Sequence, residues 1–429
     1  MRTYIKNGRV INPATKQDAV LDVIIEGKQI VQVGGFVPPE GDEDVVIDAS
    51  GCFVMPGLID LHVHFRDPGL TYKEDIETGA KAAARGGVTT VCAMPNTKPV
   101  VDNTETLKYI QEKAEKVALI HVEQLSAITM KQEGNELVDM QAMQQAGAIA
   151  FSEDGKSVMD VTLYAEAMQQ AAKLQAVVMA HCEDKALVRG GVLNEGVASR
   201  RFHVPGITNS VEDIIAARDI FLASDYGTKL HLCHCSTAAS VELVRMAKKM
   251  GLSVTAEVCP HHFTLTDSDI DTEDANYKMN PPLRTEADVQ ALIRGLQDGT
   301  MEVISTDHAP HSEEEKKQDF LHAPFGIVGL ETSASLTYTA LVATGILTPM
   351  QMAEKMSWNP AKVIGIEQER GSIEAGKLAD IMIFNPEKEY VVDVTEFASK
   401  GRNTPYNGKL LKGKVSMTIC NGKIVYQDI

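Results

Sequence analysis

No stretch of this sequence is apolar for long enough to span a bilayer, and its first residues do not form a secretory signal. We therefore expect a cytoplasmic protein with no membrane partner. A basic excess is also missing, since 41 Lys and Arg stand against 59 Asp and Glu, for a formal net charge of −18. This charge excludes nucleic acid as a partner, because phosphates need a basic surface. It does not exclude a small anionic ligand, which a few local cations can hold.

Cysteine is scarce and lacks the spacing of a metal-binding motif. The seven Cys are an odd number, and none forms a Cys-x-x-Cys pair. We expect the reduced thiols of a cytosolic protein rather than disulfides. Four cysteines lie near histidines, and for these we expect burial in apolar strands rather than metal binding: Cys182, Cys233, Cys235 and Cys259.

The middle of the chain alternates between two patterns and contains no internal repeat. Strand-like runs end near residues 64, 94, 125, 152, 181, 234, 259 and 307. Helical patterns lie between most of them, at 73–85, 104–116, 135–145, 161–174, 211–224, 238–249 and 286–296, with two more at 331–343 and 349–356. The alternation predicts a (β/α)8 TIM-like barrel over 55–366, with its functional residues at the carboxyl ends of the strands. The charged run 312–317 is expected to be a solvated loop.

Both ends of the chain are β-rich. Turn signals between β-branched runs predict hairpins at Asn7-Gly8, at Glu26-Gly27 and at Asn421-Gly422. We expect residues 1–54 and 367–429 to form one small β-sandwich domain built from both termini.

Metal-ligating residues gather at the predicted strand ends. His62 and His64 are two apart on a strand, so their imidazoles face the same way and form a chelate. Three later strands end in His181, His234 and Asp307, and Asp154 follows a fourth. Four His and two carboxylates are enough for two divalent ions that share a bridging ligand.

Two sequence motifs that contain these residues resemble those of a known family. Residues 60–66 (DLHVHFR) and 306–311 (TDHAPH), followed by Lys316, resemble the two signatures of the dihydroorotases, in the cyclic amidohydrolase branch of the amidohydrolase superfamily. The resemblance covers essentially the whole chain and is closest to the long bacterial type. It implies that one metal is held by His62, His64 and Asp307, that the other is held by His181 and His234, and that Asp154 is shared. Many relatives place a carboxylated lysine there, and Lys156 is the rival bridge in this chain.

The same resemblance implies a reaction, the reversible cyclisation of N-carbamoyl-L-aspartate to L-dihydroorotate plus water in de novo pyrimidine (UMP) biosynthesis. Two ions, expected to be Zn2+, lower the pKa of a bridging water to give hydroxide at neutral pH and polarise the amide carbonyl. Asp307 is expected to be the general acid/base.

Substrate contacts are expected from further residues near the strand ends. A substrate carboxylate calls for a bidentate Arg, and Arg66 would face the same side as His64 if its strand continued. The family resemblance adds Asn96 and His311 to this clamp, and assigns recognition of the ring amides to Asn280, Pro324, Phe325 and Gly326. The segment 311–323 is a candidate lid, and the adjacent His261 and His262 are expected to support the site or pack beside it.

Other functions and partners stay open at this point. An allantoinase or a hydantoinase would share the metals and the chemistry, and some relatives keep the barrel but serve as non-catalytic structural partners. Family habit suggests a homodimer, and some long-type dihydroorotases assemble with aspartate transcarbamoylase.

Overall fold

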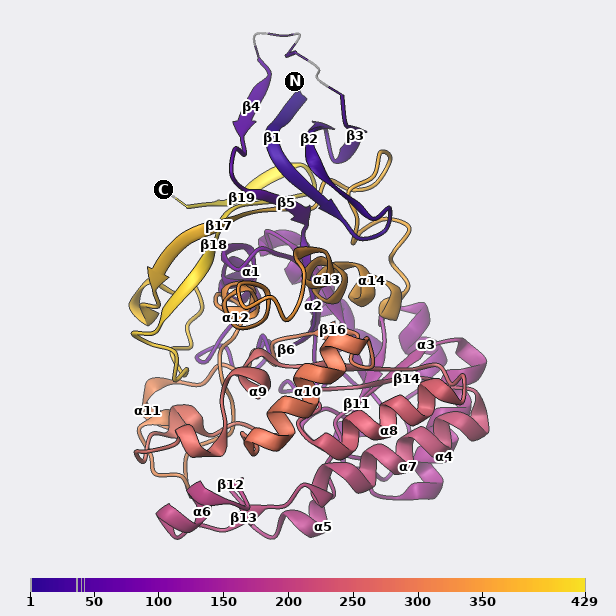
Figure 1. Cartoon of the computed structure of the whole chain (residues 1–429). Helices are drawn as coiled ribbons and strands as arrows, with labels where there is room; N and C mark the ends of the chain where they lie inside the picture. The colour runs from indigo at the N-terminus through magenta and orange to yellow at the C-terminus, as the bar shows by residue number, and fades with distance from the viewer. Residues whose placement is uncertain (1, 36–37, 40, 42, 429) are drawn as a thin grey trace.

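The computed structural model describes residues 2–35, 38–39, 41 and 43–428. Both ends of the chain meet in one sheet at the top of the molecule, and the helix-rich middle of the chain lies beneath it (Figure 1). The predicted α/β class is confirmed. In the described part of the chain, no helix is both long enough and apolar enough to cross a membrane.

Parallel strands of the middle region pair in chain order. One sheet contains β6 (Leu58–Val63), β7 (Val88–Ala93) and β8 (His121–Gln124), and the other contains β9 (Ser126–Ala127), β10 (Phe151–Ser152), β11 (Val177–Ala180), β14 (Lys229–Leu232), β15 (Val254–Val258) and β16 (Val303–Ile304). A single residue separates β8 from β9, and a parallel bridge joins Val63 to His308, just beyond β16. The carboxyl ends of these strands therefore lie on one side of the molecule.

Helices connect the strands largely as the sequence predicts. The connecting helices are α1 (Ile76–Arg85), α2 (Thr104–Val117), α3 (Met140–Gln145), α4 (Val161–Leu174), α7 (Ser210–Tyr226), α8 (Ala238–Lys249) and α10 (Glu286–Asp298). The first and third begin later than predicted, because Asp75 and Asp139 accept hydrogen bonds from backbone N–H groups of the first turn and fix where each helix starts.

Short elements that the sequence does not predict fill the loops. They are α5 (Lys185–Val188), β12 (Leu193–Asn194), α6 (Val197–Phe202), β13 (Gly206–Ile207), α9 (Pro260–Thr264) and α11 (Glu313–Lys316). The prediction of a solvated loop at 312–317 is wrong: Ser312 caps α11, and Lys316 is buried. Towards the end of the middle region lie α12 (Ser333–Thr337), α13 (Pro349–Ala353) and α14 (Asn359–Ile364), with π-helical turns after α12 and α13.

The terminal sheet joins the two ends of the chain. It contains β1 (Arg2–Asn12), β2 (Gln17–Glu26), β3 (Gln29–Val33), β4 (Val45–Asp48), β5 (Phe53–Pro56), β17 (Ile381–Val391), β18 (Leu410–Cys420) and β19 (Lys423–Gln427). The antiparallel pair of β5 with β17 connects the amino-terminal strands to the carboxy-terminal ones. One face of this sheet packs onto the middle region, since Phe53 and Phe384 share an apolar cluster with Ala80 of α1.

One predicted hairpin is wrong. The chain does not reverse at Asn7-Gly8, because β1 continues through both residues and the pairing with β2 shifts register there as a bulge. A Cβ atom on Gly8 would lie 2.3 Å from Cγ2 of Val54, so the glycine permits the close approach of β5. The hairpins at Glu26-Gly27 and Asn421-Gly422 are confirmed as the β2–β3 and β18–β19 turns.

Candidate active site

The two histidines of β6 each present one nitrogen to a shared point. Nδ1 of His62 lies 2.9 Å from Oε1 of Glu257, and Nδ1 of His64 lies 2.9 Å from Oδ1 of Asn96. Because both oxygens accept, each Nδ1 carries the proton and each Nε2 presents a lone pair. This is the arrangement of a histidine whose second nitrogen binds a metal.

Two aspartates, Asp154 and Asp307, lie close to these Nε2 atoms. Asp154 lies 3.2 Å from Nε2 of His62 through Oδ1 and 3.5 Å from Nε2 of His64 through Oδ2, and Oδ1 of Asp307 lies 3.0 Å from the same His64 nitrogen. Burial opposes both carboxylates, but His62 and His64 outweigh it, lowering the pKa of Asp307 to about 2 and that of Asp154 well below its usual range. Burial also opposes a charged His62, yet Asp154 raises the pKa of His62. The cluster therefore attracts positive charge, which a proton or a metal cation can supply.

The other two predicted histidines complete the cluster. Nδ1 of His181 lies 2.8 Å from Nε2 of His234, and these nitrogens are 3.6 and 3.7 Å from Oδ1 of Asp154. His234 and Asp307 both have left-handed backbones, with φ of 32° and 49°. Such strain, about 1–3 kcal/mol for each residue, is retained mainly where function needs it.

The residues present fit metal ions. Among the described residues, Nε2 of His62 and Oδ1 of Asp154 are buried without a hydrogen-bond partner, although they face each other. Two ligand sets share His62, one with His64 and Asp307 and one with Asp154 and His234, and the donor atoms of each set lie within 4.8 Å of one another. Imidazole and carboxylate ligands suit zinc and similar divalent ions.

The rival bridge, Lys156, points away from the cluster. Its ammonium group donates to the carbonyl oxygen of Gln132 at 2.9 Å. Asp154 is held in place by Asn96, whose amide nitrogen donates to Oδ2 at 3.2 Å. The cluster thus contains Asp154 and not Lys156.

A cavity of about 180 Å³ opens in front of the cluster. Predicted site residues make up most of its wall: His64, Arg66, Asn96, Asp154, His181, His234, Asn280, Asp307, Phe325 and Gly326. His62 is fully buried behind this wall.

Arg66 reaches the cavity by a different route from the one predicted. The strand does not continue, because β6 ends at Val63 and Arg66 has a left-handed backbone with φ of 59°. Its Nε donates to the carbonyl oxygen of Pro310 at 3.3 Å, and it forms no ion pair with any described residue. A half-buried guanidinium with no carboxylate partner among the described residues is ready to bind an anion.

Two predicted substrate residues, His311 and Pro324, lie outside the cavity wall. Nε2 of His311 donates to the carbonyl oxygen of Phe325 at 2.8 Å, and Lys73 donates to its Nδ1 at 3.2 Å. Burial and the charge of Arg66 lower the pKa of His311 to about 2, so its ring is neutral. His311 therefore contacts two cavity residues, Phe325 through this hydrogen bond and Arg66, whose terminal nitrogen lies 3.4 Å from Nε2 of His311.

Glu183 belongs to the site but is not found by sequence reasoning. Its carboxylate accepts a hydrogen bond from the side-chain amide of Asn280 and lies 3.5 Å from Nε2 of His181. This hydrogen bond uses one of the two N–H groups of the Asn280 amide, so the second N–H and the amide oxygen are left for a ligand. The only signal in the sequence is an acidic residue two positions after a strand-end histidine.

Glu257 and His231 are also missed. Glu257 accepts from His62 and lies 3.1 Å from Nε2 of His231, which the sequence leaves without a role. A single charged residue inside an apolar strand, as in the VTAEV sequence of β15, is a signal that could have identified Glu257.

Asp60 supports the same histidine from its own strand. Its carboxylate accepts from the backbone N–H groups of His62 and Thr306, both at 3.1 Å, and burial raises its pKa to about 7.

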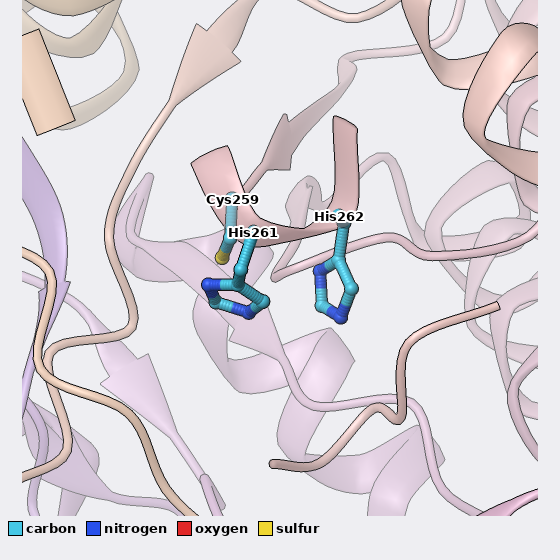
Figure 2. Close-up of side chains that lie close together, drawn as sticks. All are labelled: Cys259, His261 and His262. Atoms are coloured by element: carbon cyan, nitrogen blue, oxygen red, sulfur yellow. The ribbon is translucent and has the colours of Figure 1, made fainter. Parts of the chain in front are cut away.

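His261 and His262 form a group of their own with Cys259 (Figure 2). Cys233 also falls among ligand-type residues, with His62 and Glu257. All seven cysteines are free.

Comparisons with known proteins agree on one family. The family model described as "Dihydro-orotase-like" matches residues 51–240, and the model described as "Amidohydrolase family" matches residues 342–426. The chain is 51% identical to a dihydroorotase of Clostridioides difficile over 98% of this chain and 99% of that protein. It is 50% identical to a dihydroorotase of Pelotomaculum thermopropionicum over 100% of this chain and 99% of that protein.

Solved structures share the fold at lower identity. An L-hydantoinase (dihydropyrimidinase) from Arthrobacter aurescens gives a TM-score of 0.89 at 24% identity, covering 99% of this chain and 96% of its own. A dihydropyrimidinase from Brevibacillus agri gives a TM-score of 0.87 at 23% identity, covering 100% and 95%. At these identities the likeness concerns the fold alone.

Proposed function

The chain belongs to the dihydroorotase family, metal-dependent hydrolases of pyrimidine biosynthesis that act on a small molecule, and from that premise we propose how its buried site works. The reaction is the reversible cyclisation of N-carbamoyl-L-aspartate to L-dihydroorotate plus water. The observation that carries the assignment is the 50% identity to a curated dihydroorotase over the full chain.

The architecture proposed for this chemistry is a closed (β/α)8 barrel over 55–366, with 1–54 and 367–429 forming a separate β-sandwich domain. The parallel bridge between Val63 and His308 supports closure, since it links the first and last strand ends. The carboxylate of Asp60 supports it too, because it accepts from backbone groups on both sides of that junction.

For the metals, we assign two divalent ions per chain, with zinc favoured by the ligand types. One would be held by His62, His64 and Asp307, the other by His181 and His234, with Asp154 shared. When bound, the ions lower the pKa of a water and polarise the amide carbonyl under attack.

Asp307 would act as the general acid/base. Its low pKa keeps it a carboxylate at neutral pH, so in hydrolysis it takes a proton from the attacking water. It then returns this proton to the ring nitrogen as the amide bond breaks, and ring closure runs the same transfers in reverse. Its place in the cavity wall beside His64 supports this assignment.

The substrate carboxylate would bind Arg66, the half-buried cation without an ion pair among the described residues, with Asn96 beside it. The ring amides would meet the side-chain amide of Asn280 and the backbone of Phe325 and Gly326. His311 and Pro324 would position these groups rather than bind directly.

Another cyclic amide is the main alternative substrate, since hydantoinases share the fold. The unpaired Arg66 in the cavity favours an anionic ring over allantoin or a neutral hydantoin. A non-catalytic role is disfavoured because every ligand position is filled. The homodimer, association with aspartate transcarbamoylase, the cytoplasmic location and a mobile lid at 311–323 stay predictions.

The test is hydrolysis of L-dihydroorotate by the purified chain, with metal content measured on the same sample and allantoin and hydantoin as competing substrates. We expect turnover of L-dihydroorotate only, with at least about two ions per chain. Asp307→Asn should lower kcat by roughly 10²–10⁴-fold while most of the metal is retained. Activity within a few-fold of the parent in that variant would remove Asp307 from proton transfer.

A further inference from the structure

We propose that Cys259, His261 and His262 form an additional binding site for a thiophilic transition-metal ion such as Zn2+, separate from the ligand sets described above. The three side chains come from the end of β15 and the first turn of α9 (Figure 2). One donor atom from each lies within 4.8 Å of the others, and the two imidazole rings are 4.2 Å apart between centroids. All three residues are at most 2% exposed.

Unsatisfied imidazole nitrogens point to a missing ligand. Nε2 of His262 donates to the carbonyl oxygen of Pro281 at 2.9 Å, so its Nδ1 carries a lone pair, and this Nδ1 has no hydrogen-bond partner among the described residues. Nε2 of His261 is likewise buried and unpartnered. Buried polar atoms of this kind require an ion or a water to satisfy them.

The Cys259 thiol selects a metal ion over water. Two imidazoles and one thiolate form a ligand set typical of zinc, with the fourth position open to water. An incoming ion must displace the proton of the thiol, and the S–H bond is replaced by a sulfur–metal bond as one proton is released to solvent. Because His262 is tied to Pro281, the ion would brace β15 and α9 against the segment that carries Asn280.

Cobalt distinguishes this site from the main cluster, whose proposed ligands contain no sulfur. The purified chain loaded with Co2+ should show a near-ultraviolet thiolate-to-cobalt absorption band. Cys259→Ser should abolish the band and lower the metal content by about one ion per chain, whereas Cys233→Ser, beside His62, should leave both unchanged. His261→Gln keeps the thiol and should weaken the band. A wild-type chain without the band, or a band that survives Cys259→Ser, overturns the proposal.

A different observation concerns Lys316, which we infer to be a positioning residue for the substrate loop. Its ammonium group donates to three backbone carbonyl oxygens, those of Lys278 at 3.1 Å and of Pro324 and Gly326 at 3.0 Å. Lys278 makes contacts of its own, since its ammonium group donates to the carbonyl oxygen of Phe320 and lies 4.5 Å from the centroid of the Phe325 ring. The two lysines thus fasten the chain around Phe325 and Gly326 to the stretch that leads into Asn280.

This second inference rests on the proposed substrate contacts of Asn280, Phe325 and Gly326. Lys316→Met should raise KM for L-dihydroorotate about 10-fold or more with a smaller change in kcat, and Lys316→Arg should restore part of the loss. The exposed neighbour variant Lys317→Met should leave KM unchanged. A KM within two-fold of wild type, or a loss confined to kcat, contradicts the inference, whereas failure of the proposed function would show as no turnover in the wild type.

Discussion

The terminal sheet and the site at the strand ends bury very different residues. The sheet interior is apolar, with Ile5, Val23, Val54 and Ile381 in one cluster, and its backbone groups are paired in strand ladders. The metal-ligand cluster is equally buried but is filled with imidazoles and carboxylates, some of whose atoms have no hydrogen-bond partner in the described part of the chain. The polar groups of the sheet are therefore satisfied within the fold. The site, by contrast, contains buried charged and polar atoms that need a bound ion or ligand to satisfy them.

The largest expected effect comes from replacing Asp154, the carboxylate at the centre of the cluster. Asp154→Ala removes the carboxylate that lies near all four histidines, so we expect loss of bound metal and at least about a 10³-fold fall in kcat/KM. Lys156→Ala is the matched control, because the one hydrogen-bond partner of its ammonium group among the described residues is the Gln132 carbonyl. Metal content and the kcat/KM for L-dihydroorotate hydrolysis are measured for both variants. Equal losses in the two variants would contradict the proposed bridge.

A smaller loss is expected from the unpaired cation. Arg66→Met should reduce kcat/KM by roughly 10²–10³-fold, because the substrate carboxylate loses its charged partner in the cavity wall. Metal content should not change. The surface variant Lys81→Met, whose ion pair with Glu77 is exposed, should behave as wild type in the same steady-state assay.

The apolar sheet should respond in stability and not in catalysis. Phe384 is fully buried against Phe53 and Tyr338, with ring centroids 6.4 and 5.2 Å away. Phe384→Ala should lower the free energy of unfolding by about 3–5 kcal/mol through lost burial and a cavity. Urea unfolding measures this change, and kcat of the folded fraction should match wild type. A large fall in kcat would mean that the two regions are coupled.

Lys355 tests the comparison between buried charges that bind a ligand and those that do not, since no ligand is proposed for it. It is 4% exposed, it donates to the carbonyl oxygen of Met301, and burial lowers its pKa from 10.5 to about 8. The folded state therefore holds this proton less tightly than the unfolded state, so deprotonation favours folding and the stability contribution of Lys355 rises with pH. The advantage of Lys355→Met over wild type in urea unfolding should shrink by about 2 kcal/mol between pH 7 and pH 9.5. A difference that does not depend on pH would contradict this.

Much of this molecule can be predicted from its residues because local patterns decide it. The α4 and α8 boundaries follow from helical periodicity and from the capping residues Asp160 and Thr237. The strand-end ligands follow from the alternation of strands and helices. The Asn7-Gly8 turn fails because whether a glycine reverses the chain or forms a bulge depends on a strand that packs on it, here β5.

The residues that sequence reasoning misses are those defined by partners distant in the chain. Glu257 is 195 positions from His62, and Glu183 is 97 positions from Asn280. Lys316 belongs to a family signature, but it also lies in the charged run predicted as a solvated loop, and the sequence does not reveal its three carbonyl partners. Local patterns contain no information about such pairs.

The pairing of β5 with β17 has a consequence for synthesis of the chain. Pro56 and Ile381 are partners in this ladder, so one edge of β5 has no permanent neighbour until the ribosome has added about 330 more residues, a delay of roughly 15–65 s. During that interval the nascent chain presents an open strand edge to its surroundings. We expect chaperones to contact the emerging protein at this edge, and the final strands to act as the cover that ends their engagement.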